Sequence, residues 1–303
     1  MSNQHFKALP KPHTTYANII KSLLPIGDSD KVDKTVLPEA TYTVDTLEID
    51  HENLTDYRKI CGFKNNGLVP PTYFAVLSQA LQMNMMVKEP FPFVMLGLVH
   101  VENSVTQHRP ISEDSEFTLS VSLANLRDHD KGKQFDFITR VHEKDELVWE
   151  GTSTYLSRQK SKKTQNRAKT PTEPTEKPTL DENDMRHLWE IPEDLGRRYA
   201  FVSGDFNLIH LHPLSARAFG FPKAIAHGMW SKAKCLAELG ELPAKFRCDV
   251  SFKLPIFLPS EVEFIAKYDN RDEHIDFGVY DVSSSKPHVI GLMTDLTNDK
   301  KTI

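Results

Sequence analysis

Several features that would place the chain in another class of protein are scarce or missing. It has three cysteines in 303 residues, and Cys61, Cys235 and Cys248 are spaced for neither a disulfide framework nor a set of zinc ligands. No stretch approaches the roughly 18 to 20 consecutive apolar residues that cross a bilayer, and prolines interrupt the beginning where a signal peptide would have its apolar core. The sequence therefore predicts a cytoplasmic protein without a membrane partner.

An excess of positive charge is missing as well. The formal net charge is -5 at pH 7, so the molecule as a whole offers no basic field for a phosphate backbone, and nucleic acid is not an expected partner. The hydrophobic fraction of 39% and the charged fraction of 26% are typical of a folded, water-soluble protein. The length suits two modest domains or one large one.

One segment divides the chain. Residues 157–179 lack large apolar side chains and are rich in Lys, Thr and Pro. Such a segment cannot bury enough surface to offset its ordering entropy, which favours a mobile connection. We therefore expect an N-terminal unit at 38–156, a flexible linker at 157–182 and a C-terminal unit at 183–299.

The two halves repeat the same patterns in the same order. Residues 72–87 and 227–242 are apolar over more than one narrow stripe, which predicts two helices that strands largely bury. Strand-like alternation follows each helix, at 107–126 and 133–157 and then at 252–269 and 274–296. Because strands come in runs, a doubly wound sheet is excluded. The prediction is an α+β fold of two copies that could pack sheet to sheet, each a long helix wrapped by about four antiparallel strands.

Potential chemistry concentrates in residues 201–230. Asp205 and His210, with reference pKa values of about 3.9 and about 6.5, could together hold and deprotonate a water molecule. Asn207 between them could fix the loop or the carboxylate by hydrogen bonds. A glycine before the pair and a proline after it favour a loop that brings both side chains to one point. The spacing alone does not single out catalysis, because such pairs are common.

Gly228 begins the second predicted helix, where first-turn N–H groups have no intrahelical partner. Its N–H could stabilise negative charge on an oxygen, or the glycine could merely let the helix begin close to a strand. The histidines lack a further acidic ligand and helical HxxxH spacing, so no metal is expected. His212 is expected to be a surface or loop-capping residue.

The run YAFVSGDFNLIH at 199–210, followed by AHGM at 226–229, resembles the MaoC-like, or hydratase 2, family of (R)-specific enoyl-CoA hydratases. The family signature is GDxNPxH followed by an apolar-HGM helix start, and Leu208 stands here in place of the proline. The resemblance implies a double hotdog fold, in which an antiparallel sheet wraps a long central helix in each of two units. Residues 55–67 lack the signature, so the first unit is implied to be non-catalytic and to shape the acyl pocket. Leu208 is expected to loosen its turn.

The resemblance implies a reversible hydration of trans-2-enoyl-CoA to (R)-3-hydroxyacyl-CoA. Asp205 and His210 would activate the water, Asn207 would orient the loop, and the Gly228 N–H would hold the thioester oxygen. The CoA thioester would be the substrate, and no cofactor is implied. Side chains expected to contact the substrate are those of His227, Phe74, Phe91 and Phe93.

Alternatives remain open on the sequence alone. The chain could be a hotdog acyl-CoA thioesterase or a non-catalytic module that binds acyl-CoA. The carrier could be CoA or acyl-carrier protein, and the assembly a monomer, as a pseudo-dimer, or a homodimer. The sequence does not rank the candidate cations for the phosphates of CoA, which are the linker lysines, Arg247, Lys253 and Lys267.

Overall fold

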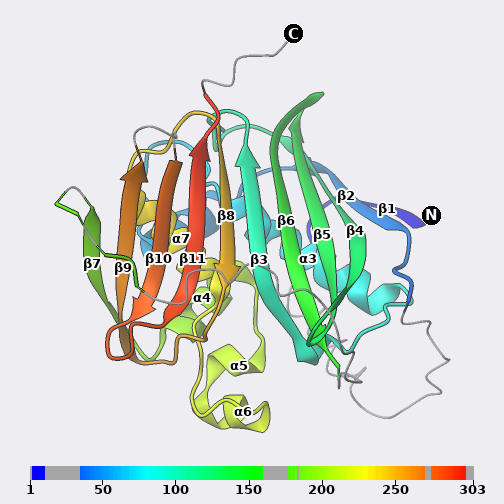
Figure 1. The fold of residues 1–303 in the computed structure, drawn as a ribbon. Coiled ribbons are helices and arrows are strands. Elements are labelled where there is room, and N and C mark those ends of the chain that lie inside the picture. Colours follow the sequence, from blue (N-terminus) through cyan, green and yellow to red (C-terminus); the bar gives the residue numbers. More distant parts are fainter. Residues whose placement is uncertain are drawn as a thin grey trace.

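The computed structural model describes residues 2–10, 35–159, 177–179, 181–182, 184–269 and 274–297. A single sheet of 11 strands extends across the molecule, and two long helices, α3 (Tyr73–Lys88) and α7 (Gly228–Leu239), lie behind one of its faces (Figure 1). Both match the helices predicted from the sequence. Most of the predicted linker, 160–176, lies outside the described residues, so the proposed domain boundaries stay predictions.

The first half of the chain forms one end of the sheet. Its strands are, in spatial order, β1 (Ser2–Phe6), β2 (Ala40–Leu47), β4 (Phe117–His129), β5 (Gly132–Glu143), β6 (Glu146–Arg158) and β3 (Leu98–Gln107). Neighbours pair antiparallel except β1, which pairs parallel with β2. Alternate side chains of β4 are buried, and its Phe117 lies against Phe74 of α3 with ring centroids 5.1 Å apart. The helix is thus buried by the strands, as its apolar pattern predicts.

The second half repeats this arrangement. Its strands are, in spatial order, β8 (Phe246–Phe252), β11 (Pro287–Asp295), β10 (His274–Asp281), β9 (Ser260–Asp269) and β7 (Met185–Ile191). All of these neighbours pair antiparallel. In both halves the strand that precedes the long helix lies toward the outer end of the sheet, and the strand that follows the helix lies in the middle. The predicted duplication of an α+β unit is confirmed.

The two halves join edge to edge, which corrects the expectation of sheet-to-sheet packing. Strand β3 pairs antiparallel with β8, from Glu102 opposite Ser251 to Gln107 opposite Phe246. Each unit alone would expose this strand as an edge with unpaired N–H and C=O groups. Pairing the two edges satisfies these groups and makes one continuous sheet.

Short helices complete the fold. They are α2 (His51–Cys61), the 3₁₀ helix η1 (Met95–Gly97), α4 (Leu195–Ser203), α5 (Leu208–Leu211) and α6 (Pro213–Ala218). Helices α2 and α4 each end at a glycine in the left-handed region, Gly62 with φ 89° and Gly204 with φ 73°. Asp205 follows the second of these glycines, whereas Phe63 follows the first. Helices α5 and α6 project beyond the end of the sheet (Figure 1).

Within the described ranges, no helix is both long enough and apolar enough to span a bilayer.

Candidate active site

A cavity of about 520 Å³ has walls from both halves of the chain. The first half supplies residues of α3, η1, β3 and β6, and the second half supplies the segment from Asp205 to Met229 together with the end of β8. Three methionines, Met83, Met86 and Met95, make part of the first-half wall. The volume of the cavity and its lining by both apolar and polar side chains are typical of a small-molecule site. Methionine side chains adapt readily to a flexible ligand.

Asp205 is positioned by the turn that ends α4. Its N–H donates to Ser203 Oγ at 3.2 Å, and its Oδ1 accepts from the N–H of Asn207 at 3.1 Å. Asn207 then caps α5, because its side chain accepts from the N–H of Ile209 at 3.4 Å. The loop that carries the carboxylate is therefore closed by local hydrogen bonds, and the side chains of Asp205 and Asn207 line the cavity.

His210 lies on α5 and is buried. Its Nδ1 lies 2.7 Å from the carbonyl oxygen of Ile225. Since a carbonyl only accepts, Nδ1 carries the proton and Nε2 keeps its lone pair. Burial lowers the pKa of His210, against an opposing effect of the Asp205 charge. The imidazole is thus neutral at pH 7 and presents a proton acceptor at the cavity wall.

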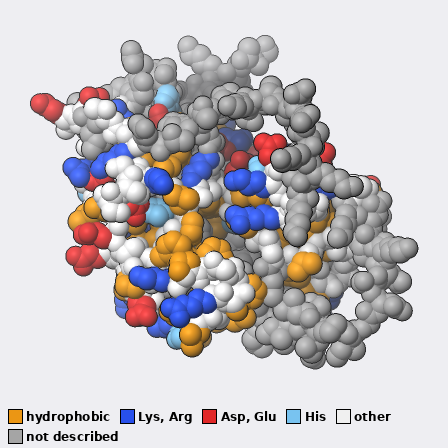
Figure 2. Space-filling view, turned by 60° about the horizontal axis from the view of Figure 1, so that its bottom comes forward, with side chains coloured by type: hydrophobic (Ala, Val, Ile, Leu, Met, Phe, Trp, Pro, Cys, Tyr) orange, Lys and Arg blue, Asp and Glu red, His pale blue; other side chains and the backbone are white. Residues whose placement is uncertain are grey.

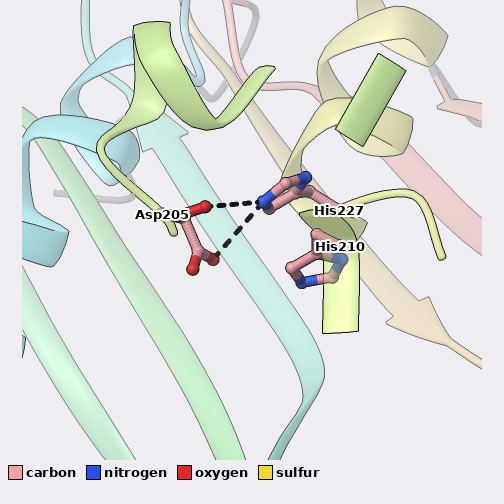
Figure 3. Close-up of side chains that lie close together, drawn as sticks. All are labelled: Asp205, His210 and His227. Carbon is pink, nitrogen blue, oxygen red and sulfur yellow. Dashed lines mark hydrogen bonds and ion pairs between the residues drawn. The ribbon is translucent and has the colours of Figure 1, made fainter. Parts of the chain in front are cut away.

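His227 is the residue immediately before α7 and lies close to both Asp205 and His210 (Figure 3). Its Nε2 donates to the backbone oxygen of Asp205 at 3.0 Å and lies 4.0 Å from Oδ2 of the same residue. Its ring stacks on that of His210, with centroids 3.7 Å apart and planes at 26°. Burial, and secondly the neighbouring His210, lower the pKa of His227 to about 3. His227 lines the cavity, and it also joins the loop of Asp205 to the start of α7. Its contact with substrate stays a prediction.

Possible ligand atoms of Asp205, His210 and His227 lie within 4.8 Å of one another. Three such groups could in principle hold a metal ion. Here, however, the two rings are stacked, so their in-plane lone pairs do not converge on one point, and His227 Nε2 already donates to a carbonyl. The arrangement suits a water molecule between carboxylate and imidazole better than an ion. The absence of a metal stays a prediction.

Gly228 is the first residue of α7 and lines the cavity. A Cβ atom at this position would lie 3.1 to 3.2 Å from the ring of Phe252 on β8, closer than most real contacts. The glycine therefore lets the helix begin close to a strand, which was one of the two interpretations of the sequence. Its N–H is also one of the first-turn groups of α7 that have no acceptor within the helix, at a helix end that favours negative charge.

The three phenylalanines expected to contact substrate lie away from the cavity wall. Phe74 packs against Phe117 and Trp149 in the core, and Phe91 and Phe93 pack against Phe135. Other residues of the first half line the cavity, namely Ala75, Gln79, Gln82 and Met86 of α3 and Tyr155 of β6. The spacing 75, 79, 82 and 86 is that of one face of a helix. These residues could therefore have been predicted as a group from helical periodicity, whereas the prediction chose phenylalanines.

Of the candidate cations, the structure brings Lys253 to the cavity. Arg158, which was not predicted from the sequence, lines it too. Arg247 instead pairs with Asp249 at 2.7 Å, and Lys267 donates to the Thr179 oxygen at 2.8 Å. The linker lysines within 160–176 lie outside the described residues.

The exposed His212 caps α6 by accepting from the N–H of Leu214 at 3.1 Å, which confirms the prediction of a capping role.

Leu208, at the position where the resembled family has proline, is the first residue of α5. Proline is favoured there because its fixed φ suits a helix and the first N–H has no intrahelical acceptor. Asn207 has ψ 127°, the extended conformation that a following proline requires. We therefore expect Leu208→Pro to raise the free energy of unfolding by about 0.4 to 1 kcal/mol with unchanged turnover. Urea unfolding measures this, and a loss of stability would show that the leucine N–H has a needed acceptor.

The buried histidines should also make stability depend on pH. The pKa values of His210 and His227 are lowered by burial, so below pH 6.5 the unfolded chain takes up protons that the folded chain does not. The free energy of unfolding should therefore decrease as the pH is lowered below 6.5, by up to about 1.4 kcal/mol per pH unit for each histidine. Urea unfolding at pH 7.5, 6 and 5 measures the slope. His227→Gln should reduce it, and an unchanged slope would contradict the assignment of His227 as a buried neutral group.

Comparison with known sequences identifies relatives of this chain. The family model described as MaoC like domain matches residues 157–285. Over 225 residues the chain is 36% identical to 3-hydroxyacyl-thioester dehydratase X of Mycobacterium tuberculosis, an alignment covering 74% of this chain and 79% of that protein. Over 69 residues it is 39% identical to the (R)-specific enoyl-CoA hydratase of Aeromonas caviae, covering 21% of this chain and 52% of that protein.

Solved structures show the same fold. The crystal structure of HtdX from Mycobacterium tuberculosis superposes with a TM-score of 0.72 at 30% identity, covering 84% of this chain and 100% of that one. A further protein of the same organism, described as having a double hotdog fold, superposes with a TM-score of 0.53 at 8% identity over 85% of this chain and 96% of that one. The latter likeness concerns the fold alone, and together they confirm the predicted double hotdog.

Proposed function

The chain belongs to the MaoC-like dehydratase family and is a hydratase/dehydratase of the hydro-lyase type, and on this premise we propose that it adds water reversibly to a trans-2-enoyl thioester to give the (R)-3-hydroxyacyl thioester. The observation that carries the proposal is the bond from His210 Nδ1 to the Ile225 oxygen. It leaves the Nε2 lone pair of a neutral imidazole available, and a ring nitrogen of His210 lies within 4.8 Å of an Asp205 carboxylate oxygen.

Asp205 and His210 would hold the nucleophilic water between them. Their polar atoms lie within 4.8 Å of each other, a separation that one water bridges with two hydrogen bonds of about 2.8 Å. The water oxygen would bond to C3 as one of its protons passes to His210 Nε2. The Asp205 carboxylate accepts the other water hydrogen and stabilises the imidazolium that forms.

The electron pair displaced from the double bond would move onto the thioester oxygen. The N–H of Gly228 at the start of α7 would stabilise that oxygen, because the helix dipole and the unpaired first-turn N–H groups favour negative charge there. The proton held by His210 would then pass to C2 on the face where water added. No proton is gained or lost by the enzyme over the cycle, so the same residues serve dehydration in reverse.

The cavity supports a division of labour between the halves. The acyl chain would extend along α3 past Gln79, Met83 and Met86, whose span of about one and a half to two helical turns measures roughly 10 Å. The phosphates of a CoA carrier would be met by Lys253 and Arg158 at the cavity lining. The first half would thus bind substrate without taking part in proton transfer.

The test is to incubate the purified protein with trans-2-octenoyl-CoA and follow two signals in parallel. Hydration removes the conjugated double bond, which lowers the enoyl absorbance, and leaves the thioester intact. A thioesterase would release free thiol instead, and a binding module would produce neither signal. We expect loss of enoyl absorbance without thiol release, and release of thiol at the same rate would overturn the assignment. Chiral analysis of the 3-hydroxyacyl product tests the (R) configuration separately.

A further inference from the structure

The cavity wall that the first half supplies contains polar side chains which the proposed reaction does not use. Gln82 of α3, His100 of β3 and Tyr155 of β6 all line the cavity and are called here the polar wall. The ring of His100 stacks on that of Tyr155, with centroids 4.7 Å apart and planes at 14°. Tyr155 Oη donates to Gln82 Oε1 at 3.5 Å. The three side chains therefore form one continuous patch.

The protein itself uses only part of the hydrogen-bonding capacity of the polar wall. The contact between Tyr155 and Gln82 is long for a hydrogen bond, and Gln82 Nε2 donates to Ser78 Oγ at 2.9 Å. Among the residues that the structure describes, His100 Nε2 is buried and has no hydrogen-bond partner. A buried polar atom without a partner costs free energy. The polar wall therefore offers hydrogen bonds to the molecule that fills the cavity.

Both titratable side chains of the polar wall are neutral at pH 7. Burial, and secondly the charge of Lys232, lower the pKa of His100 to about 4. Burial and the charge of Asp205 raise the pKa of Tyr155 above its ordinary value, so the phenol keeps its proton. A neutral wall suits an uncharged oxygen function, such as a hydroxyl, ether or carbonyl group, better than a carboxylate or a phosphate.

The position of the polar wall indicates which part of a substrate would meet it. On the face of α3 that lines the cavity, Gln79 and Gln82 stand between Ala75 and Met86. Along the helix axis, Gln82 lies about 10 Å from Ala75 and about 6 Å from Met86. The apolar side chains are thus at the two ends of this face and the polar ones in its middle. The middle of a bound acyl chain, rather than its end, would pass the polar wall.

The polar wall belongs to the interior of the cavity and not to the surface of the molecule. Figure 2 shows the end of the molecule that carries α5 and α6, with hydrophobic side chains near the centre of the face and Lys and Arg side chains around them. Gln82, by contrast, is only 2% exposed. Its polar atoms can therefore serve a group inside the cavity but not a partner on the surface.

We propose that the acyl chain of the natural substrate carries an uncharged oxygen function beyond C3, and that the polar wall binds this oxygen. The inference rests on the proposed function and names the class of its substrate, an enoyl thioester with an oxygenated chain. An alkyl chain would displace water from the wall and leave its polar atoms without partners. An oxygen in the chain accepts from Tyr155 Oη, and a hydroxyl group also donates to Gln82 Oε1.

The test replaces one methylene group of the substrate by oxygen. Trans-2-octenoyl-CoA and its 5-oxa, 6-oxa and 7-oxa analogues have nearly the same length and shape, but the ether oxygen accepts a hydrogen bond. The loss of enoyl absorbance gives kcat/KM for each. We expect the wild type to prefer the best oxa analogue over octenoyl-CoA by about tenfold, since one hydrogen bond inside a protein contributes on that order. The three oxygen positions locate the polar wall along the chain.

Tyr155→Phe tests which side chain causes this preference. The variant loses the donor hydroxyl and keeps the ring that stacks on His100. It should lower the ratio of kcat/KM for the best oxa analogue to kcat/KM for octenoyl-CoA by about tenfold. The matched control is Tyr268→Phe on β9, where the tyrosine is 40% exposed and is not part of the cavity lining. The control should leave kcat/KM for every analogue within about twofold of the wild type.

Three outcomes would overturn the assignment of the polar wall. The first is equal wild-type kcat/KM for octenoyl-CoA and all oxa analogues. The second is an equal loss on both kinds of substrate in Tyr155→Phe, which would place the hydroxyl at the reaction centre instead. If no thioester is hydrated, the proposed function fails, and calorimetric binding of octanoyl-CoA and its oxa analogues to wild type and Tyr155→Phe decides. Equal affinities would then be the third.

Discussion

Asp205→Asn should lower kcat/KM for enoyl thioester hydration by about 10²- to 10⁴-fold, the usual contribution of a positioned acid or base. Asparagine keeps the shape of the side chain and can still accept from the Asn207 N–H, which the carboxylate does at 3.1 Å. It cannot hold the water as an anion or stabilise a cationic His210. The variant should therefore fold and bind substrate, with the loss confined to kcat. Steady-state kinetics on octenoyl-CoA measure this split.

The partner experiment is His210→Gln, which removes the proton acceptor and should cost a similar factor. Because the two residues act on one water, the double variant should be little worse than either single one. The matched control is His212→Asn, an exposed histidine two residues away whose capping of the Leu214 N–H asparagine can replace. Full activity of either catalytic variant, or multiplied losses in the double variant, would contradict a shared water.

Lys232→Met should cost the fold about 3 kcal/mol or more, since a buried acceptor that loses its donor costs about 1 to 3 kcal/mol. Lys232 on α7 is fully buried, and its three donors reach Asn103 O at 2.9 Å, Asn103 Oδ1 at 2.7 Å and Cys248 O at 3.0 Å. Asn103 belongs to β3 and Cys248 to β8. The ammonium group therefore joins α7 to both strands at the junction between the halves. Urea unfolding of the wild type and the variant measures how much these hydrogen bonds stabilise the fold.

The matched control for this variant is Lys234→Met on the same helix. Lys234 pairs with Glu238 in a partly exposed i,i+4 arrangement, which contributes at most about 1 kcal/mol. A similar small loss for Lys232→Met would mean that relief from burying the charge offsets the lost hydrogen bonds. Burial lowers the pKa of Lys232, which shows that its charged form is destabilised inside the native protein. The substitution by methionine removes this cost.

Local patterns in the sequence predicted the elements whose structure is decided locally. The helices now seen as α3 and α7 were predicted within a few residues, and so were most strands that follow them. The strands β2, β3, β7 and β8 and the helices α2 and α4 were not predicted. Strands β3 and β8 form by pairing with each other across the middle of the sheet, and that partner is far away in sequence.

The candidate site shows the same division. Asp205, Asn207, His210 and Gly228 stand in one short motif, so the sequence was enough to group them. The stacking of His227 on His210 depends on how α5 meets α7. Which residues line the cavity depends on which face of α3 points toward it. Gln82 and Met86 line the cavity, whereas Phe74 packs against Phe117 in the core.

By itself, the sequence determined the duplicated α+β unit, the residues of the 199–228 motif and the lack of that motif in the first half, because hydrophobic periodicity and short-range spacing are properties of neighbouring residues. Tertiary structure alone decided the edge-to-edge junction, the burial of Lys232 and the neutral state of the buried histidines. Each depends on contacts between distant residues, such as Lys232 and Asn103, which are 129 positions apart. Burial and hydrogen-bond partners of this kind are fixed only when the chain has folded.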